Sequence, residues 1–208
     1  YYIDDISLNP APTSFTYEDF EGGAKLNWNA ADGSFVVVPN PPGGDTLKLN
    51  GSTQVGAYTK KAGAGYSLFL TELAQPLDLS IYNVFKIQVK AAVASSFLLK
   101  LEGPGVFAEE VKNIAVKDQW VEYTFNFSKS AGVKTFNKII LFFDPGVDAS
   151  SDTYLFDNLI AVTAGDCAGV DKNPDILDDF ECQRNAAYGQ PGFDDITAVD
   201  NPDKFGAN

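Results

Sequence analysis

Several stretches of the chain alternate apolar and polar residues, the period-two pattern of a strand that buries one face. The clearest are residues 85–90, Phe-Lys-Ile-Gln-Val-Lys, and residues 120–127, Trp-Val-Glu-Tyr-Thr-Phe-Asn-Phe. Residues 138–143 are more continuously apolar, which indicates a strand covered on both sides. The same reasoning predicts further strands at residues 15–20, 34–38, 46–49, 54–60, 66–70, 97–101, 106–111 and 154–162.

Glycine and proline separate these stretches and predict the turns between them. Residues 39–44, Pro-Asn-Pro-Pro-Gly-Gly, cannot extend a strand ladder and are expected to form a surface loop. No apolar stripe with a period of 3.6 residues runs longer than two turns, so we expect little helix. Many short strands at this spacing predict an all-β fold, an antiparallel β-sandwich of the jelly-roll type.

Two segments near the ends of this predicted sandwich occur twice. Residues 154–162 are similar to residues 1–8, and residues 17–21 are similar to residues 177–181. We interpret the chain as part of a longer tandem array with a period of about 155 residues. It then holds the closing strand of one repeat (1–8), a linker (9–14), one complete repeat (15–163), a second linker (164–176) and the opening part of the next repeat (177–208).

The composition excludes several functions. The net charge of −13 would repel phosphate backbones, so nucleic-acid binding is not expected. No apolar run approaches the length of about 18 residues that a membrane span needs. The two cysteines, Cys167 and Cys182, would form a disulfide across a short loop in an oxidising compartment, and two buried thiols are the alternative.

Catalytic chemistry has little support in the sequence. The chain contains no histidine, which excludes every nucleophile that depends on a Ser-His or Cys-His pair. A glycosidase needs only two carboxylates, but the candidates by type lie at turns, in charged pairs or on the polar faces of predicted strands. These candidates are Glu102, Glu109, Glu110 and Glu122. We therefore expect the protein not to be an enzyme.

One loop places three carboxylates, those of Asp144, Asp148 and Asp152, close together in the sequence. The loop lacks the glycine and the terminal glutamate of an EF-hand loop. We interpret it as an acidic turn, with a cation site as the alternative.

The ends of the complete repeat resemble a known family. Asp19-Phe20-Glu21 at its start and the Tyr-x-x-Asp-Asn pattern of residues 154–158 at its end resemble the bacterial carbohydrate-binding modules related to family 4. Two further patterns, Trp-x-x-Tyr-x-Phe at 120–125 and Phe-x-x-Ile-x-Leu at 136–141, are similar to the same family. The resemblance implies a galactose-binding-like jelly roll of about 145 residues.

The same resemblance implies a structural calcium ion where the first and last strands meet. Its ligands would be Glu21 or Asp19 together with Asp157 and backbone carbonyls. Hard cations prefer six to eight oxygen ligands, and two carboxylates brought together repel each other unless a cation or a proton lies between them. The alternative is that these acids are solvated turn residues.

Aromatic side chains are the candidates for sugar binding, because an exposed ring stacks on the C–H face of a pyranose. Trp28 is the first candidate, since it lies in the polar stretch Asn27-Trp28-Asn29, although it could instead cover the edge of the sandwich. Tyr58, Tyr66 and Phe107 are secondary candidates. Trp120 is expected to be a packing residue.

These features together favour a non-catalytic, calcium-stabilised repeat of a secreted or cell-surface bacterial protein. Its partners would be a polysaccharide or surface glycan and the adjacent repeats of the same protein. The alternative is a purely structural spacer in a long adhesin or filament, and tandem repetition suits both, because repetition also raises the avidity for a glycan.

Overall fold

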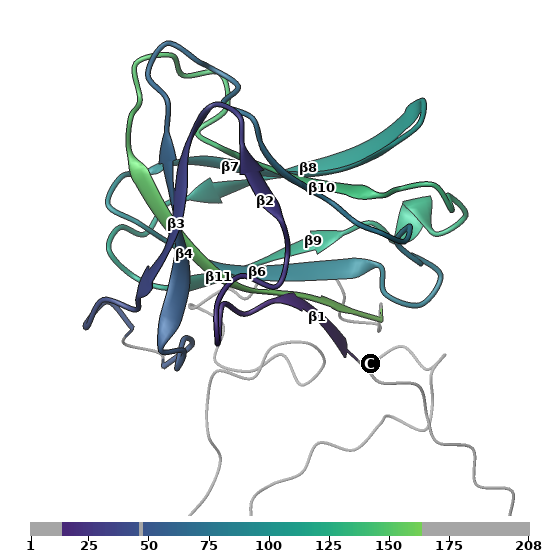
Figure 1. Ribbon diagram of the computed structural model, residues 1–208, viewed down its shortest axis with the longest axis horizontal. Coiled ribbons are helices and arrows are strands. Elements are labelled where there is room, and N and C mark those ends of the chain that lie inside the picture. Colours follow the sequence, from purple (N-terminus) through teal and green to yellow (C-terminus); the bar gives the residue numbers. More distant parts are fainter. Residues whose placement is uncertain (1–13, 46–47, 164–208) are drawn as a thin grey trace, which may run out of the picture. The chain divides into compact units, whose positions relative to one another are not determined.

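The computed structural model describes residues 14–45 and 48–163 (Figure 1). The chain divides into two units, Tyr1–Gly169 and Val170–Asn208, and every described residue belongs to the first. The predicted closing strand at residues 1–8, most of the linker at 9–14, the linker at 164–176, the opening of the next repeat and both cysteines lie outside the described residues. The tandem array and the disulfide therefore stay predictions.

The described residues form eleven strands in two antiparallel sheets, which confirms the predicted all-β sandwich. The strands are β1 (Ser14–Glu18), β2 (Trp28–Ala30), β3 (Gly33–Pro39), β4 (Gln54–Lys60), β5 (Phe69–Glu72), β6 (Val84–Ala91), β7 (Ser95–Gly103), β8 (Val106–Ile114), β9 (Val121–Asn126), β10 (Lys138–Phe143) and β11 (Thr153–Val162). One short 3-10 helix, η1 (Ser128–Ser130), is the helical element of the described part. No helix in this part is long and apolar enough to span a membrane.

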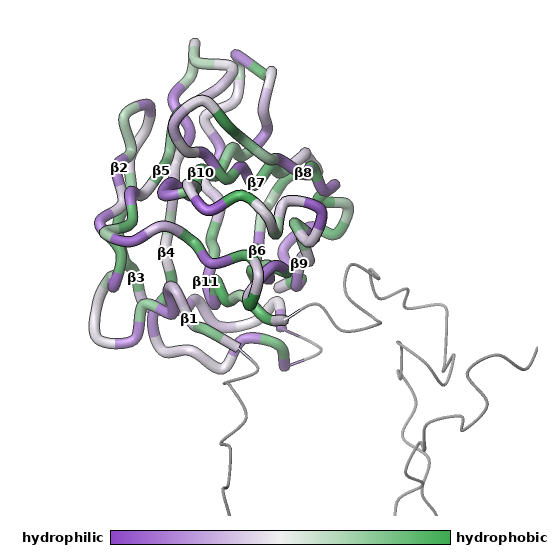
Figure 2. Tube along the Cα trace, turned by 90° about the vertical axis from the view of Figure 1, so that its right-hand side faces the viewer, coloured by the Kyte–Doolittle hydropathy of each residue, from purple (hydrophilic) through white to green (hydrophobic). Residues whose placement is uncertain are grey.

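The two sheets lie face to face, as the two rows of strand labels in Figure 2 show. Sheet 1 has the order β3-β4-β11-β6-β9, and β1 also pairs with β11. Sheet 2 has the order β2-β5-β10-β7-β8. The chain crosses between the sheets repeatedly, so most strand neighbours are far apart in the sequence.

Stacked aromatic rings fill the space between the sheets. Trp28 stacks on Phe69 with 4.8 Å between ring centroids, and Phe69 stacks on Tyr58 at 4.5 Å. Phe143 continues the row, 5.7 Å from Tyr58 and 4.8 Å from Phe97. Each such ring removes a large apolar area from water and gains a further 0.5–1.5 kcal/mol, roughly, from favourable pair geometry. The aromatic row therefore joins both sheets into one core.

Most predicted strands are present, with differences of a few residues at their ends. The predicted strand at 46–49 is wrong for its described part, because Lys48 and Leu49 belong to a loop. The structure adds β2, which the sequence suggested was a loop. A three-residue strand that begins in a polar stretch gives too short an alternation to detect, and it forms because it pairs with β5.

The last strand, β11, pairs on one side with two different strands. Its residues 153–156 pair with β4, and its residues 159–162 pair with β1. On its other side the register to β6 shifts between Asp157 and Ile160, and Asn158 there has φ of 50°. Asn adopts this left-handed conformation more readily than most residues. The irregularity leaves Asp157 beside the gap between β4 and β1.

The carboxylate of Glu18 fixes the crossing from β1 to β2. This side chain is fully buried, at 0% exposure, and accepts hydrogen bonds from backbone amides and from an indole. The donors are Asp19 N (3.1 Å), Phe20 N (3.0 Å), Lys25 N (2.9 Å), Leu26 N (2.9 Å) and Trp28 Nε1 (3.1 Å). Hydrogen bonds of this kind to a charged acceptor are stronger than those to a neutral one.

We expect Glu18→Gln to destabilise the fold by about 3 kcal/mol, because the new amide group would point N–H bonds at N–H donors in a buried site. Urea unfolding followed by tryptophan fluorescence measures the change. Glu122→Gln is the matched control, since Glu122 is partly exposed and pairs with Lys86 at 3.0 Å. The control should stay within about 1 kcal/mol of wild type. Equal stability of the two variants would contradict the structural role of Glu18.

Candidate functional site

The outer face of sheet 2 carries three rows of side chains that cross the strands. Strand register places them on one face, because residues directly opposite each other point the same way. The first row is Glu72, Lys138, Glu102 and Phe107; the second is Asn29, Leu70, Ile140, Lys100 and Glu109; the third is Phe142, Leu98 and Val111. We call this surface the sheet-2 face.

Ion pairs hold the polar side chains of the sheet-2 face. Lys138 Nζ lies 2.9 Å from Glu72 Oε1, and Lys100 Nζ lies 2.7 Å from Glu102 Oε2. The hydrogen bond to Glu72 and its negative charge raise the pKa of Lys138. Lys100 also lies over the ring of Phe107, 4.8 Å from its centroid. Each lysine is therefore paired, and its remaining N–H groups are available to a ligand.

Apolar and aromatic side chains occupy the rest of the sheet-2 face. Ile140 and Leu98 point outward but are only 3% and 8% exposed, because larger side chains flank them across the strands. Phe142 contacts the ring of Tyr66 edge-on, with 6.0 Å between centroids. Ile140 thus accounts for the apolar run of β10, which the sequence predicted to be covered on both sides.

Two exposed rings mark opposite parts of this face. Tyr66 is 65% exposed and Phe107 is 63% exposed. Tyr66 contacts Phe142 of β10, and Phe107 belongs to β8, two strands away in the sheet. In the strand register, Phe142 is level with Val111 of β8, four residues along that strand from Phe107. At about 3.3 Å per residue and 4.8 Å per strand, Phe142 and Phe107 are roughly 16 Å apart. A ligand that touches both rings must be extended.

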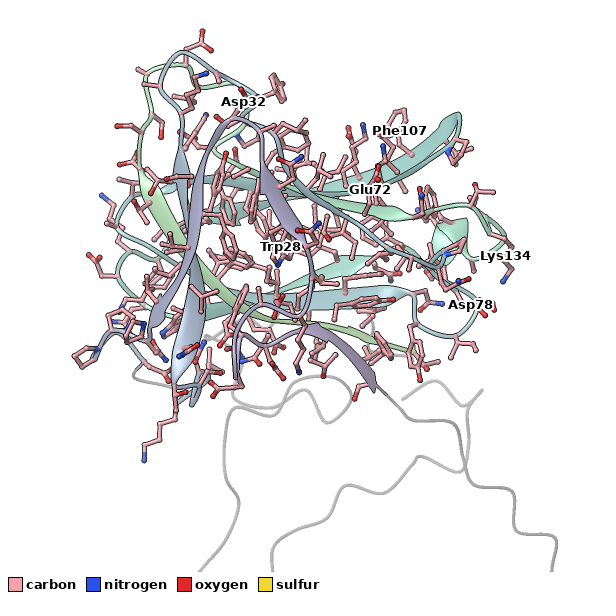
Figure 3. All side chains as sticks on the ribbon, in the orientation of Figure 1. Trp28, Asp32, Glu72, Asp78, Phe107 and Lys134 are labelled. Carbon is pink, nitrogen blue, oxygen red and sulfur yellow. The ribbon has the colours of Figure 1, made fainter. Side chains whose placement is uncertain are left out.

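The other two predicted sugar-binding residues do not face solvent in this way. Trp28, labelled in Figure 3, lies on β2 at the edge of sheet 2 and is partly buried, because its ring packs on Phe69 and its indole N–H donates to Glu18. Tyr58 is fully buried, and its hydroxyl donates to the backbone carbonyl of Asp32. Tyr58 is therefore a core residue, and Trp28 is partly buried with one ring face packed against the core.

The outer face of sheet 1 is different, because the loop after β3, described at residues 40–45 and 48–53, lies over it. Gln88 Nε2 donates to Leu49 O at 2.9 Å, and Lys90 Nζ donates to Gly43 O at 2.7 Å. A polar pocket of about 230 Å³ lies beside this loop. It is lined by Asn40, Pro41, Pro42, Gly43, Asp45, Asn50, Ser52, Thr53 and Trp120.

Asp157 is buried beneath this loop. Asn50 Nδ2 donates to its Oδ2 at 2.9 Å, and the backbone N–H of Asn158 donates to its Oδ1 at 2.8 Å. Burial raises the pKa of Asp157 to about 6, and the negative charge of Glu21 adds to the shift, while the hydrogen bonds oppose it. The charged form of Asp157 is therefore less favourable than that of an exposed carboxylate, and a nearby cation would stabilise it.

The structure brings two of the three predicted calcium ligands into electrostatic range. Glu21 accepts hydrogen bonds from Thr53 N at 2.6 Å and Thr53 Oγ1 at 2.7 Å, which lower its pKa. Asp19 instead forms an ion pair with Lys25. Within the described residues, no group of three or more His, Cys, Asp or Glu side chains is arranged to hold a metal ion.

Two residues with large roles were not among the sequence-predicted sites. Glu18 directly precedes the predicted Asp19 and Glu21, and its function as an acceptor for backbone amides leaves no pattern in the sequence. Phe142 lies inside an apolar run, where its outward direction depends on strand register.

Comparison with solved structures shows the fold of carbohydrate-binding modules. A family 11 module from Clostridium thermocellum, in complex with a β-1,3-1,4-mixed-linked tetrasaccharide, is 13% identical; the match covers 74% of this chain and 98% of that one, with a TM-score of 0.52. CBM27-1 of Caldicellulosiruptor saccharolyticus, in complex with mannohexaose, is 10% identical over 72% of this chain and 97% of that one, with a TM-score of 0.51.

An exo-β-agarase also contains a similar sandwich. It is 12% identical, and the match covers 72% of this chain and 25% of the agarase, with a TM-score of 0.56. No family model and no curated protein matches the sequence. The structural likeness confirms the predicted fold, a β-sandwich like that of carbohydrate-binding modules.

The raised pKa of Asp157 predicts a pH-dependent stability. The folded state holds this proton up to about pH 6, whereas the ordinary value is 3.8. Stability should therefore fall as pH rises from about 4 to about 6, by on the order of 2–3 kcal/mol from this group. Urea unfolding at each pH, in buffer with a chelator, measures the effect as the difference between wild type and Asp157→Asn. Parallel pH profiles for the two proteins would contradict it.

Proposed function

We propose that the sheet-2 face binds a polysaccharide chain and that the protein is a non-catalytic binding module. The observation that carries this proposal is the pair of exposed rings, Tyr66 and Phe107, on either side of a row of hydrogen-bonding side chains. Stacking on rings combined with a few placed polar groups is how proteins commonly bind sugars and other small polar ligands. Two solved structures with this fold are complexes with oligosaccharides, which supports the proposal.

The charges of the sheet-2 face favour a neutral glycan. Lys100 and Lys138 are each paired with a glutamate, and Glu109 lies opposite Lys100 as a further acid. The face thus carries more acidic than basic side chains, and the whole chain has a net charge of −13. An anionic polysaccharide would be repelled. Neutral sugars instead offer hydroxyl groups that both lysines and glutamates can pair.

A polysaccharide ligand fits an extracellular location, on a cell surface or as part of a secreted protein. There the module would attach the rest of its protein to a glycan. The spacer function that the sequence also allowed needs no exposed aromatic rings on an open sheet face, so the sheet-2 face favours binding over a purely structural role.

We also propose that calcium binds between Glu21 and Asp157, with Asp19 outside the site. The two carboxylates repel each other when both are charged at neutral pH. A cation between them would remove this repulsion. Asn50 and Thr53 now donate to these oxygens, so calcium must replace some of these hydrogen bonds. The side chain of Asn40 donates a hydrogen bond from its Nδ2 to Asn50 Oδ1. Its own Oδ1 atom is buried and has no hydrogen-bond partner among the described residues.

For glycan binding, we expect wild type to bind at least one neutral oligosaccharide, and Tyr66→Ala and Phe107→Ala each to weaken binding about tenfold through loss of a stacking surface. Calorimetric titration with a β-1,3-1,4-mixed-linked tetrasaccharide, mannohexaose and an agarose hexasaccharide measures this. Phe15→Ala is the control, because Phe15 is 48% exposed but belongs to β1 of sheet 1. Its affinity should equal that of wild type.

The absence of binding to every neutral glycan on a larger array would contradict the binding function and favour the spacer. Equal losses in Phe15→Ala and Phe107→Ala would contradict the placement of the site on the sheet-2 face. Thermal melts of all variants ensure that the comparison is made on folded protein.

For calcium, we expect the ion to stabilise the protein by about 2.7 kcal/mol at a concentration 100 times its dissociation constant. Melting curves with calcium chloride and with EGTA measure the shift. Glu21→Gln should remove most of the shift, whereas Asp19→Asn should keep it, because Asp19 pairs with Lys25. Identical melting curves with and without calcium would rule out the site.

A further inference from the structure

Lys60, the last residue of β4, is a buried cation that the binding face does not use directly. It is 2% exposed, and its ammonium group donates to three backbone carbonyls. These are Asp144 O (2.5 Å), Val147 O (2.5 Å) and Gly65 O (3.1 Å). An ammonium has three N–H donors, so the three carbonyls satisfy it completely. A lysine is almost never buried to this degree unless hydrogen-bond acceptors or negative charges pair with its ammonium group.

The ammonium of Lys60 occupies the centre of the acidic loop that the sequence suggested as an alternative cation site. Burial lowers the pKa of Lys60, but the negative charges of Asp144, Asp148 and Asp152 oppose that shift and favour the charged form. Carbonyl and carboxylate oxygens around a positive charge are the arrangement that a bound hard cation has in other proteins. Here the cation is part of the chain, so the loop needs no external ion.

Lys60 joins two loops that lie at the same end of the sandwich, at the upper left of Figure 1. One is the turn of residues 61–68, and the other is the loop of residues 144–152. Further hydrogen bonds connect them: Gly63 N donates to Asp148 O at 2.7 Å, and Gly146 N donates to Gly65 O at 2.9 Å. The contact at Gly65 is close enough that a Cβ atom would lie 2.6 Å from Asp148 Oδ1.

The residue after Gly65 is Tyr66, one of the two exposed rings of the sheet-2 face. Tyr66 is 65% exposed, and its described ring contact is the edge-on one with Phe142. A ring with so little side-chain packing depends on its backbone for its position. That backbone is held through Gly65 by the ammonium of Lys60 and by the amide of Gly146.

We propose that Lys60 is a positioning residue for glycan binding, an internal cation that holds the backbone of Tyr66 where its ring can stack on the sugar. This inference rests on the proposed glycan-binding function and adds to it a buried residue that does not touch the ligand. Preorganisation of this kind improves affinity because the loop need not be ordered when the ligand binds.

A double-mutant cycle tests the proposal with whichever oligosaccharide of the titration panel binds wild type most tightly. Lys60→Met keeps most of the side-chain volume and removes the charge. We expect it to weaken binding about fivefold when Tyr66 is present, and to have no further effect in the Tyr66→Ala background. In the Phe107→Ala background its effect should remain about fivefold. Lys61→Met is the matched control, because Lys61 is the exposed neighbour in the same turn.

A second variant covers the case in which Lys60→Met does not fold. Gly146 has φ of 84°, so Gly146→Ala strains the turn that supplies carbonyls to Lys60, and the new Cβ atom would lie 3.8 Å from the hydroxyl oxygen of Tyr66, an ordinary van der Waals distance that does not displace the ring. Gly43→Ala is its control, since Gly43 has φ of 82° and open space but lies in the loop over sheet 1. Gly146→Ala should weaken binding severalfold in a Tyr66-dependent manner, and Gly43→Ala should not.

Amide hydrogen exchange gives a measurement that needs no ligand. In Lys60→Met the amides of Gly63 and Gly146 should exchange at least tenfold faster, with the amides of β6 and β7 unchanged. If wild type binds no glycan but these amides respond, the proposed function fails and the loop-ordering role stands. If exchange is unchanged, or if Lys60→Met and Tyr66→Ala weaken binding additively, the positioning role is overturned.

Discussion

The hydrogen bonds that the carboxylate of Glu18 accepts are the interaction on which the rest of the sandwich depends. Glu18 is the last residue of β1 in sheet 1, and a loop connects it to β2 in sheet 2. Backbone amides of this loop and the indole N–H of Trp28 donate hydrogen bonds to its buried carboxylate. Without this acceptor the amides would be buried and unpaired. The same carboxylate orients Trp28, whose ring begins the aromatic row through the core. One charged acceptor thus couples the loop, the second sheet and the core packing.

The irregularity in β11 connects the last strand to the loop that lies over sheet 1. β11 changes register at Asp157, and this side chain accepts a hydrogen bond from Asn50 of the loop that lies over sheet 1. The loop covers the polar side of β6 through Gln88 and Lys90. Sheet 2 keeps exposed rings and ion pairs on its outer side. The outer faces of the two sheets therefore differ, because one contacts the anchored loop and the other carries exposed rings.

The sequence predicted the fold well because two-residue alternation and turn residues directly reflect half-buried antiparallel strands. Tyr66 and Phe107, which the sequence offered as secondary sugar-binding candidates, are exposed in the structure, and their role in binding stays a prediction. The sugar-binding role of Trp28 stays a prediction, but its polar neighbourhood in the sequence did not show that β2 packs the ring on Phe69 and directs its indole N–H at Glu18. Glu18 and Lys60 escaped detection for a related reason: their partners are backbone atoms, which carry no sequence signal.

The two acidic ends of the sandwich neutralise their charge in different ways. At the end that carries Tyr66, the carbonyls and carboxylates surround Lys60, whose charge is covalently attached and present at any ion concentration. Beneath the loop of sheet 1, burial raises the pKa of Asp157, and the negative charge of Glu21 adds to the shift. Protons and metal ions can therefore affect the stability of the loop over sheet 1. In the proposed binding mode, the position of Tyr66 depends instead on Lys60, through the backbone of Gly65.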